Sequence, residues 1–357
     1  MNRKKITVKK KKVIIGLSGG IDSAASASLL KSEGYEVIGV TFNFLSSEQT
    51  ITAAKKVAEN LQIEHHVLEA QNQFRKNVIL PFIDAYKNGE TPNPCMLCNQ
   101  TMKFPLLCDF AKINDQAAIA TGHYAEVKKK DNSYELWASP NARKDQSYFL
   151  YHLNQEVLKK LIFPLNAFES KNQVRGMIKK LLPELSKGAE SQGICFIPKK
   201  GHQLFLKQAI FGSQPAEAGI FVDSSGKILG RHKGIQNFTL GQTRGLGLLS
   251  NTKWAVVGLE PQTNTVVLDD EQVLFKDRIF VDQLFVHPHV DLTKQEFSFK
   301  TCRWGHIYRG QIERLPGNQA IVHSRQSVRA PAPGQALVFY QGRRVLGGGI
   351  IKHFEFR

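Results

Sequence analysis

Residues 16–23, with the sequence GLSGGIDS, are polar and glycine-rich and directly follow the apolar run 13–15. An alanine-rich stretch comes next, so we expect a strand, a tight turn and a helix. Glycines allow such a turn to point backbone N–H groups inward, and the helix N-terminus adds positive charge, which together favour an anion such as phosphate. The segment lacks the lysine of GxxxxGK[ST] and does not match GxGxxG. The simpler alternative is a turn in which Asp22 or Ser23 only caps the helix.

A second candidate site is the CxxC motif of Cys95 and Cys98 within TPNPCMLCNQTMKF, residues 91–104. Because two prolines directly before the motif disfavour a helix, we expect both cysteines on a shaped loop. A reactive thiol, a zinc site and an iron-sulfur cluster with a third cysteine all fit the motif. Zinc needs a second ligand pair, which Cys108 and His123 do not supply convincingly, so the reactive thiol is favoured.

A further cysteine, Cys195, lies in ESQGICFIP, residues 190–198. Taken alone, a cysteine in a short apolar run is typically a small buried hydrophobe. The chain has five cysteines, an odd number in a chain of 357 residues, which argues against a structural disulfide framework. Catalytic, redox or metal-binding roles are therefore favoured.

The charge of the chain indicates a polyanionic partner. Its 48 Lys and Arg residues exceed its 31 Asp and Glu residues, which gives a formal net charge of +17. A basic surface gains free energy by releasing counterions from nucleic-acid phosphates. The alternative is an ordinary lysine-rich surface whose charged faces are only solvated.

No run of 18 apolar residues occurs, so no transmembrane helix is expected. The basic N-terminal segment MNRKKITVKKKK lacks the apolar region and cleavage site of a signal peptide. We therefore expect a soluble, cytoplasmic protein.

The first third of the chain alternates short β-branched runs with helical patterns. Strands are expected at 13–17, 36–42, 64–69 and 117–125, and helices at 23–32, 50–61 and 77–89. This alternation predicts an α/β fold in which helices cover a parallel sheet. From about residue 211 the helical periodicity ends and turn signals separate short β runs, which predicts a β-rich remainder, plausibly two small barrels. The expected domains are 1–210, 211–278 and 279–357.

Seven motifs occur in one order along the chain: GLSGGIDS, TPNPCMLCNQTMKF, TGHYA, KDQSYFL, ESQGICFI, GRHKGIQNFTLGQTRGLGL and APGQALVFYQGRRVLGGGII. Together they resemble the bacterial tRNA-specific 2-thiouridylase family, and SGGIDS resembles the PP-loop of the ATP pyrophosphatase superfamily. The resemblance implies an adenine-nucleotide α-hydrolase-like domain, a small central β domain and a C-terminal β-barrel. It also implies that ATP is cleaved to AMP and pyrophosphate while sulfur replaces O2 of the wobble uridine, position 34, in tRNAs for Lys, Glu and Gln.

The resemblance also implies roles for individual residues. Cys195 carries the incoming sulfur as a persulfide, and Cys98 is the nucleophile that leaves a Cys98–Cys195 disulfide, which an external reductant resets. The implied partners are tRNA and a sulfur-relay protein or cysteine desulfurase as persulfide donor, with ATP and Mg²⁺ as cofactors. The residues implied to bind ATP are Gly16, Leu17, Ser18, Gly19, Gly20, Ile21, Asp22, Ser23, Phe42 and Gly122. The residues implied to bind the target base are Asn93, Pro94 and Cys95. Those implied to contact the rest of the tRNA are His123, Lys144, Asp145, Gln146, Arg303 and Gln335.

Independently of the family, the segment RKDQSYF, residues 143–149, combines cations, an amide and two aromatic rings. This set is suited to phosphate contacts and to stacking on an unpaired base. The alternative is an ordinary loop.

One position departs from the family pattern, because better-known members have Asp where this chain has Cys95. A thiol is a weak hydrogen-bonding group and normally neutral, so proton transfer at this position is open. Cys95 is then either a resolving thiol or a tolerated variant. Two alternatives for the whole chain are an iron-sulfur-dependent tRNA thiolase of the same superfamily and a non-catalytic RNA-binding protein that kept its PP-loop.

Overall fold

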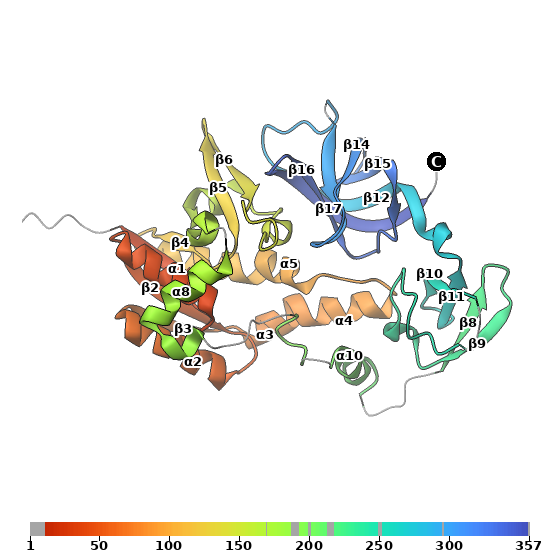
Figure 1. Cartoon of the computed structure of the whole chain (residues 1–357), viewed down its shortest axis with the longest axis horizontal. Coiled ribbons are helices and arrows are strands. Elements are labelled where there is room, and N and C mark those ends of the chain that lie inside the picture. Colours follow the sequence, from red (N-terminus) through yellow and green to blue (C-terminus); the bar gives the residue numbers. More distant parts are fainter. Residues whose placement is uncertain are drawn as a thin grey trace, which may run out of the picture. The chain divides into compact units, whose positions relative to one another are not determined.

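The computed structural model describes residues 11–168, 170–186, 193–198, 201–212, 218–248, 252–294 and 296–355 (Figure 1). The chain divides into two compact units. We call Met1–Arg75 with Cys98–Gln192 the first unit, and Lys76–Leu97 with Gly193–Arg357 the second unit.

The first unit is built on a parallel sheet with the strand order β3-β2-β1-β4-β7. The side chains of Val13, Ile14 and Ile15 in the central strand are fully buried, as expected for a parallel sheet covered on both faces. The strand order reverses at β1, because β2 and β3 lie on one side of it and β4 on the other. The strands are β1 (Lys12–Gly16), β2 (Glu36–Asn43), β3 (Glu64–Glu69), β4 (Ala118–Ala120) and β7 (Leu161–Ile162).

Helices with small or apolar faces pack on this sheet. In α1 (Ile21–Ser32), Ala24, Ala25 and Ala27 are fully buried, and α8 (Lys171–Leu181) packs against it with Val174 and Ile178 in the same apolar core (Figure 1). The remaining helices of the unit are α2 (Glu48–Leu61), α3 (Gln71–Phe74), α6 (Phe104–Ile113), α7 (Gln155–Lys160) and α9 (Pro183–Ser186), and a hairpin is formed by β5 (Ala125–Lys130) and β6 (Ser133–Ala138). The predicted α/β alternation is confirmed.

Two local predictions were wrong. The run 117–125 is not one strand, because the chain turns away after β4 and carries Gly122 against the Asp22 backbone before β5 begins. The CxxC motif is not on a loop, because α5 (Pro94–Cys98) is a helix that starts at the second proline. Proline is well tolerated at the first position of a helix, where its missing N–H has no acceptor and its φ angle already suits the helix.

The helical segments around the CxxC motif contain two π-helical turns. The first, Arg75–Ile79, leads into α4 (Leu80–Lys87), and the second, Asn99–Lys103, continues α5 into α6. In the second unit α4 packs against α10 (His202–Phe211), and Phe82, Phe196 and Leu206 share one apolar cluster.

The second unit contains a four-stranded sheet with the order β10-β11-β8-β9. The strands are β8 (Gly219–Asp223), β9 (Ile228–His232), β10 (Ala255–Glu260) and β11 (Thr265–Asp269). Their core includes the fully buried Phe221, Val256, Val266 and Leu268.

A closed antiparallel barrel completes the second unit. Its pairings run β12-β15-β14-β13-β16-β17, and β17 pairs back with β12, so every strand has two neighbours. A Cβ at Gly347 would overlap the backbone at Phe285, so this glycine allows β17 to approach β12. The strands are β12 (Phe275–Val286), β13 (Phe297–Lys300), β14 (Tyr308–Leu315), β15 (Gln319–Arg329), β16 (Ala336–Gln341) and β17 (Arg344–Glu355).

The prediction of a β-rich remainder is confirmed. After α10 ends at Phe211, the described part of the chain contains strands and two short 3₁₀ turns, Ile235–Asn237 and Glu271–Leu274. Within the same ranges, no helix combines the length and hydropathy needed to cross a membrane.

Candidate active site

The glycine loop, residues 16–23, leaves the carboxyl end of β1 and enters α1. In open α/β sheets, ligands bind outside the carboxyl ends of the strands where the strand order reverses. The loop lies at that point, between the ends of β1 and β4. At its start the Leu17 N–H donates to the Val40 carbonyl at 2.7 Å, and the Thr41 hydroxyl donates to the Leu17 carbonyl at 2.7 Å.

Only glycine fits at one point of this loop. Gly19 has φ +74°, and a Cβ there would lie 2.6 Å from the Ala53 Cβ and 2.8 Å from the Ala54 nitrogen. At Gly20, the N-cap of α1, the nearest atom to a Cβ would be the Ser18 hydroxyl at 3.4 Å. The space above the helix N-terminus is therefore open, which fits an anion.

Ser23 fixes the shape of the loop from inside. Its hydroxyl donates to the Gly20 carbonyl at 3.0 Å and accepts the Ser18 N–H at 3.2 Å, and its side chain is buried. No side chain caps α1, since its N-cap Gly20 has none. Neither Asp22 nor Ser23 therefore caps the helix.

Asp22 is the centre of a polar network within the first unit. Its Oδ1 accepts the Tyr124 hydroxyl at 3.0 Å, and its Oδ2 accepts the Lys171 ammonium at 3.2 Å. The Lys171 side chain is only 14% exposed, so its charge is held beside the glycine loop. A cation in this position can bind the phosphates of a ligand at the glycine loop.

Sequence reasoning missed both Tyr124 and Lys171. A signal for Lys171 exists, because it occupies the first position of α8, where the helix dipole disfavours a cation. Its neighbour Ser170 forms a capping box with Gln173, which fixes the start of α8. The capping box thereby places Lys171 beside Asp22.

The segment after β4 approaches the same loop. A Cβ at Gly122 would lie 2.9 Å from the Asp22 carbonyl carbon and 2.9 Å from the Ser23 nitrogen. The neighbouring His123 forms a hydrogen bond with the Thr121 hydroxyl at 2.8 Å and stacks near Phe104. A Cβ at Gly16, where the loop starts, would lie 3.7 Å from the Phe42 ring and 3.9 Å from the Thr121 methyl group. The structure thus brings the predicted ATP-binding residues together.

The segment 144–146 is connected to this network by internal hydrogen bonds. The Asp145 carboxylate is buried and accepts the N–H groups of Ser139 and Ser147 and the Ser147 hydroxyl. The Gln146 N–H donates to the Tyr124 carbonyl at 2.9 Å, and the Tyr124 N–H donates to the Gln146 side-chain oxygen at 3.0 Å. Gln146 therefore positions Tyr124, whose hydroxyl bonds Asp22, while Asp145 holds the turn that carries Gln146.

The aromatic part of this segment does not fit the stacking hypothesis. Tyr148 is 1% exposed, so its ring cannot stack on an RNA base. Phe149 is half-buried, and its carbonyl accepts the side-chain amide of Asn99 at 3.1 Å. The segment is therefore mainly a structural support, with Lys144 half-buried at its start.

The two cysteines of the CxxC motif differ in environment. Cys98 is 9% exposed and precedes the buried Asn99, which also accepts the Lys103 ammonium at 3.1 Å. Cys95 is half-buried, and its N–H donates to the Asn93 side-chain oxygen at 3.2 Å. Asn93 therefore stabilises the start of α5, in the manner of a capping residue.

Cys195 lies in the second unit, in the segment 193–198. Its side chain is exposed, so the hypothesis of a small buried hydrophobe is wrong. The neighbouring Ile194, Phe196 and Ile197 take the apolar positions against α4 and α10 instead. The Cys195 thiol is therefore accessible from solvent.

The two remaining cysteines, Cys108 and Cys302, lie outside the CxxC motif and the segment 193–198. Burial raises the pKa of the Cys108 thiol, which makes it a poor nucleophile. Cys302 is exposed on the barrel. Across the described ranges, no group of three or more His, Cys, Asp or Glu side chains could hold a metal ion.

The remaining predicted tRNA contacts lie on the barrel of the second unit. Arg303 is half-buried, with its guanidinium 4.4 Å from the ring centroid of the exposed Trp304. The Gln335 side chain donates to the carbonyl of Thr91 at 2.6 Å.

Comparisons with known proteins cover nearly the whole chain. Family models match residues 11–199 (tRNA methyl transferase HUP domain), 203–270 (tRNA methyl transferase PRC-barrel domain) and 282–351 (Aminomethyltransferase beta-barrel domain). The tRNA-specific 2-thiouridylase MnmA of Caldicellulosiruptor saccharolyticus is 38% identical over 360 residues, which span 96% of this chain and 99% of that protein. The chain belongs to the tRNA-specific 2-thiouridylase family. The protein of the same name from Clostridium perfringens is 36% identical, over 96% of this chain and 99% of its own length.

A solved structure of a 4-thiouridine synthetase in complex with RNA and ATP is also similar, with 18% identity and a TM-score of 0.37. The match covers 52% of this chain and 45% of that one. The assignment to the 2-thiouridylase family depends on the full-length relatives alone.

Proposed function

We propose that this chain catalyses the ATP-dependent 2-thiolation of the wobble uridine, position 34, in tRNAs for Lys, Glu and Gln. The observation that carries the proposal is the glycine loop at the reversal of the strand order, with Asp22 bonded to both Tyr124 and Lys171. Membership of the 2-thiouridylase family supplies the acceptor, which a nucleotide-binding loop alone leaves open.

ATP is the substrate that the glycine loop would hold. Its phosphates would face the N-terminus of α1 and the Lys171 ammonium, and Phe42 and Gly122 would flank the nucleotide at the loop's start. Mg²⁺ would be held mainly through the phosphates, as is usual for this ion, because Asp22 is the only carboxylate of the loop and no dedicated cluster of ligands is found in the described ranges.

The chemistry follows from the weak reactivity of a uridine. Its C2 carbonyl is a poor electrophile with a poor leaving group, so O2 is first joined to the α-phosphate of ATP and pyrophosphate departs. The terminal sulfur of a Cys195 persulfide then attacks C2 and displaces AMP. The Cys98 thiolate attacks the Cys195 sulfur, breaks the S–S bond and releases the 2-thiouridine. A Cys98–Cys195 disulfide remains, and an external dithiol reduces it.

The test is mass spectrometry of tRNA nucleosides after incubation of the protein with unmodified tRNA, ATP, Mg²⁺ and a persulfide donor. We expect 2-thiouridine at position 34, with one AMP formed for each sulfur inserted. Absence of 2-thiouridine while AMP is still formed would show that the loop serves another acceptor.

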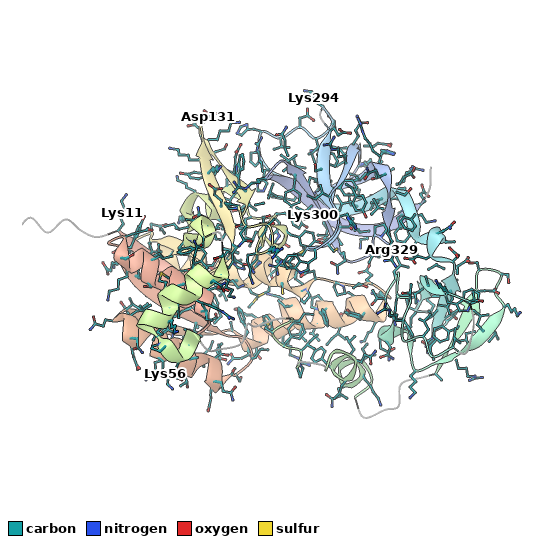
Figure 2. The ribbon with its side chains drawn as sticks, viewed as in Figure 1. Lys11, Lys56, Asp131, Lys294, Lys300 and Arg329 are labelled. Atoms are coloured by element: carbon teal, nitrogen blue, oxygen red, sulfur yellow. The ribbon has the colours of Figure 1, made fainter. Side chains whose placement is uncertain are left out.

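The positive charge should act through tRNA phosphates. Exposed lysines occur in both units, such as Lys56 on α2 and Lys294 beside the barrel (Figure 2). We expect tRNA binding to weaken steeply with salt, with a slope of log K against log salt of roughly −0.7 to −0.9 for each phosphate contact. A filter-binding titration between low and moderate ionic strength measures this slope, and a slope of zero would reject a phosphate-based interface.

A further inference from the structure

The segment 90–93 connects α4 to α5 and carries part of the predicted base-binding triplet. Helix α4 ends at Lys87 with Asn88 as its C-cap, Gly89 follows with φ +70°, and Asn93 stabilises the start of α5. Within the segment, Pro92 and the following Pro94 fix two φ angles and restrict the residues before them. A fixed position at Thr91 therefore determines where Asn93 and Cys95 lie.

A turn of the barrel, residues 332–335, holds the segment 90–93 within the second unit. The Thr91 N–H donates to the Pro333 carbonyl at 2.8 Å, and the Gln335 side-chain N–H donates to the Thr91 carbonyl at 2.6 Å. Both backbone polar groups of Thr91 are thus bonded to one turn. A longer ion pair of 3.9 Å joins Lys352 to Glu90 beside them.

The barrel turn is itself rigidly held. The Gly334 N–H donates to the Ile351 carbonyl at 2.9 Å, and the Ile351 N–H donates to the Gln335 carbonyl at 2.8 Å. Gly334 has φ +87°, and a Cβ there would lie 3.1 Å from the Thr91 nitrogen and 3.1 Å from the Glu90 Cβ. Glycine is required both for the backbone conformation and for the close approach.

We propose that Gln335 is a positioning residue, which fixes the base-binding triplet by holding Thr91 against the barrel. The bonded N–H of its amide is then not available to tRNA, in contrast to the contact that the family resemblance implies. The inference rests on the proposed function, because that function assigns the target base to the triplet Asn93, Pro94 and Cys95. The hydrogen bond from Gln335 to Thr91, and its effect on the position of Thr91, do not depend on that function.

Three variants separate positioning from RNA contact. Gln335→Met and Gln335→Glu remove the donor at similar size. Gly334→Ala removes no group that RNA could contact, but it crowds Thr91. Gln311→Met is the matched control, because Gln311 is exposed on β14 of the same barrel. Thermal unfolding of all four variants reports whether the barrel stays folded.

The expected result is a fall in kcat for thiolation on the order of tenfold for both Gln335 variants, which is the scale of one lost hydrogen bond. The KM and Kd for tRNA should stay within about twofold of wild type, and Gly334→Ala should lower kcat in the same way. A tenfold rise in Kd with unchanged kcat for the Gln335 variants would overturn the proposal in favour of a direct RNA contact.

A second measurement does not depend on activity. Hydrogen–deuterium exchange of the Thr91 amide, resolved by overlapping peptides without tRNA or ATP, should become about tenfold faster in Gln335→Met but not in Gln311→Met. Unchanged exchange at Thr91 would overturn the proposal. Faster exchange in a protein that forms no 2-thiouridine would leave the positioning contact standing and reject only the proposed function.

Discussion

Asp22→Ala is expected to lower the formation of AMP from ATP by about 100-fold or more, equivalent to about 2.7 kcal/mol of lost transition-state stabilisation. Asp22 bonds both the Tyr124 hydroxyl and the Lys171 ammonium, so its loss removes both of these contacts beside the glycine loop. Ser23→Ala should have a similar effect, because the hydrogen bond from the Ser18 N–H to the Ser23 hydroxyl, which shapes the loop, is lost.

The measurement is AMP release in the presence of saturating tRNA, together with the Kd for tRNA, which should stay nearly constant. Lys171→Met should reproduce much of the loss, since it removes the cation from the phosphates while Asp22 and Tyr124 stay bonded. Asp109→Asn and Lys112→Met are matched controls, because they break an exposed Asp–Lys pair at 2.9 Å in the same unit. Undiminished AMP formation in Asp22→Ala and Ser23→Ala would contradict the assignment of the glycine loop to ATP.

The strand, turn and helix around this loop could be predicted because their signals are local. An apolar β-branched run, a turn with three glycines and an alanine-rich helix occupy 20 consecutive residues, 13–32, and the structure confirms β1 and α1 there. The partners of Asp22 could not be predicted in this way. Tyr124 and Lys171 lie 102 and 149 residues further along the chain, and only the fold brings them together.

Three of the wrong predictions share one cause, which is that the position of a residue within its element overrides what its residue type predicts. Pro94 by its type disfavours a helix, but it occupies the first position of α5, where proline is tolerated. The ring of Tyr148 was considered for RNA stacking, but it packs inside the first unit. Cys195 looked like a core residue beside apolar neighbours, yet those neighbours are the ones that face the core.

The departure at Cys95 gives the most discriminating experiment, because this chain places a thiol where better-known relatives have a carboxylate. If Cys195 carries the persulfide and Cys98 resolves it, Cys98→Ser and Cys195→Ser should each eliminate thiolation, with activity below about 1% of wild type. Only Cys195→Ser should lose the extra sulfur that intact mass detects after loading with a donor.

Cys95→Ser should keep substantial activity, and Cys95→Asp should match wild type, since a carboxylate at this position is compatible with the family's chemistry. Two thiols outside the candidate site serve as controls. Cys108→Ser alters a half-buried thiol whose pKa is raised by desolvation, and Cys302→Ser alters an exposed one. Both should leave thiolation and sulfur loading intact.

An iron-sulfur mechanism makes a different prediction for the same variants. Because Cys95 and Cys98 are three residues apart on α5, both would serve as cluster ligands, and the loss of either would be equally damaging. Equal loss at Cys95 and Cys98, with Cys195→Ser still active and a visible absorbance band in anaerobically prepared protein, would reject sulfur transfer through two cysteines. Retention of activity by Cys95→Ser would instead exclude a cluster that needs both thiols and leave Cys98 as the cysteine of this motif that the reaction requires.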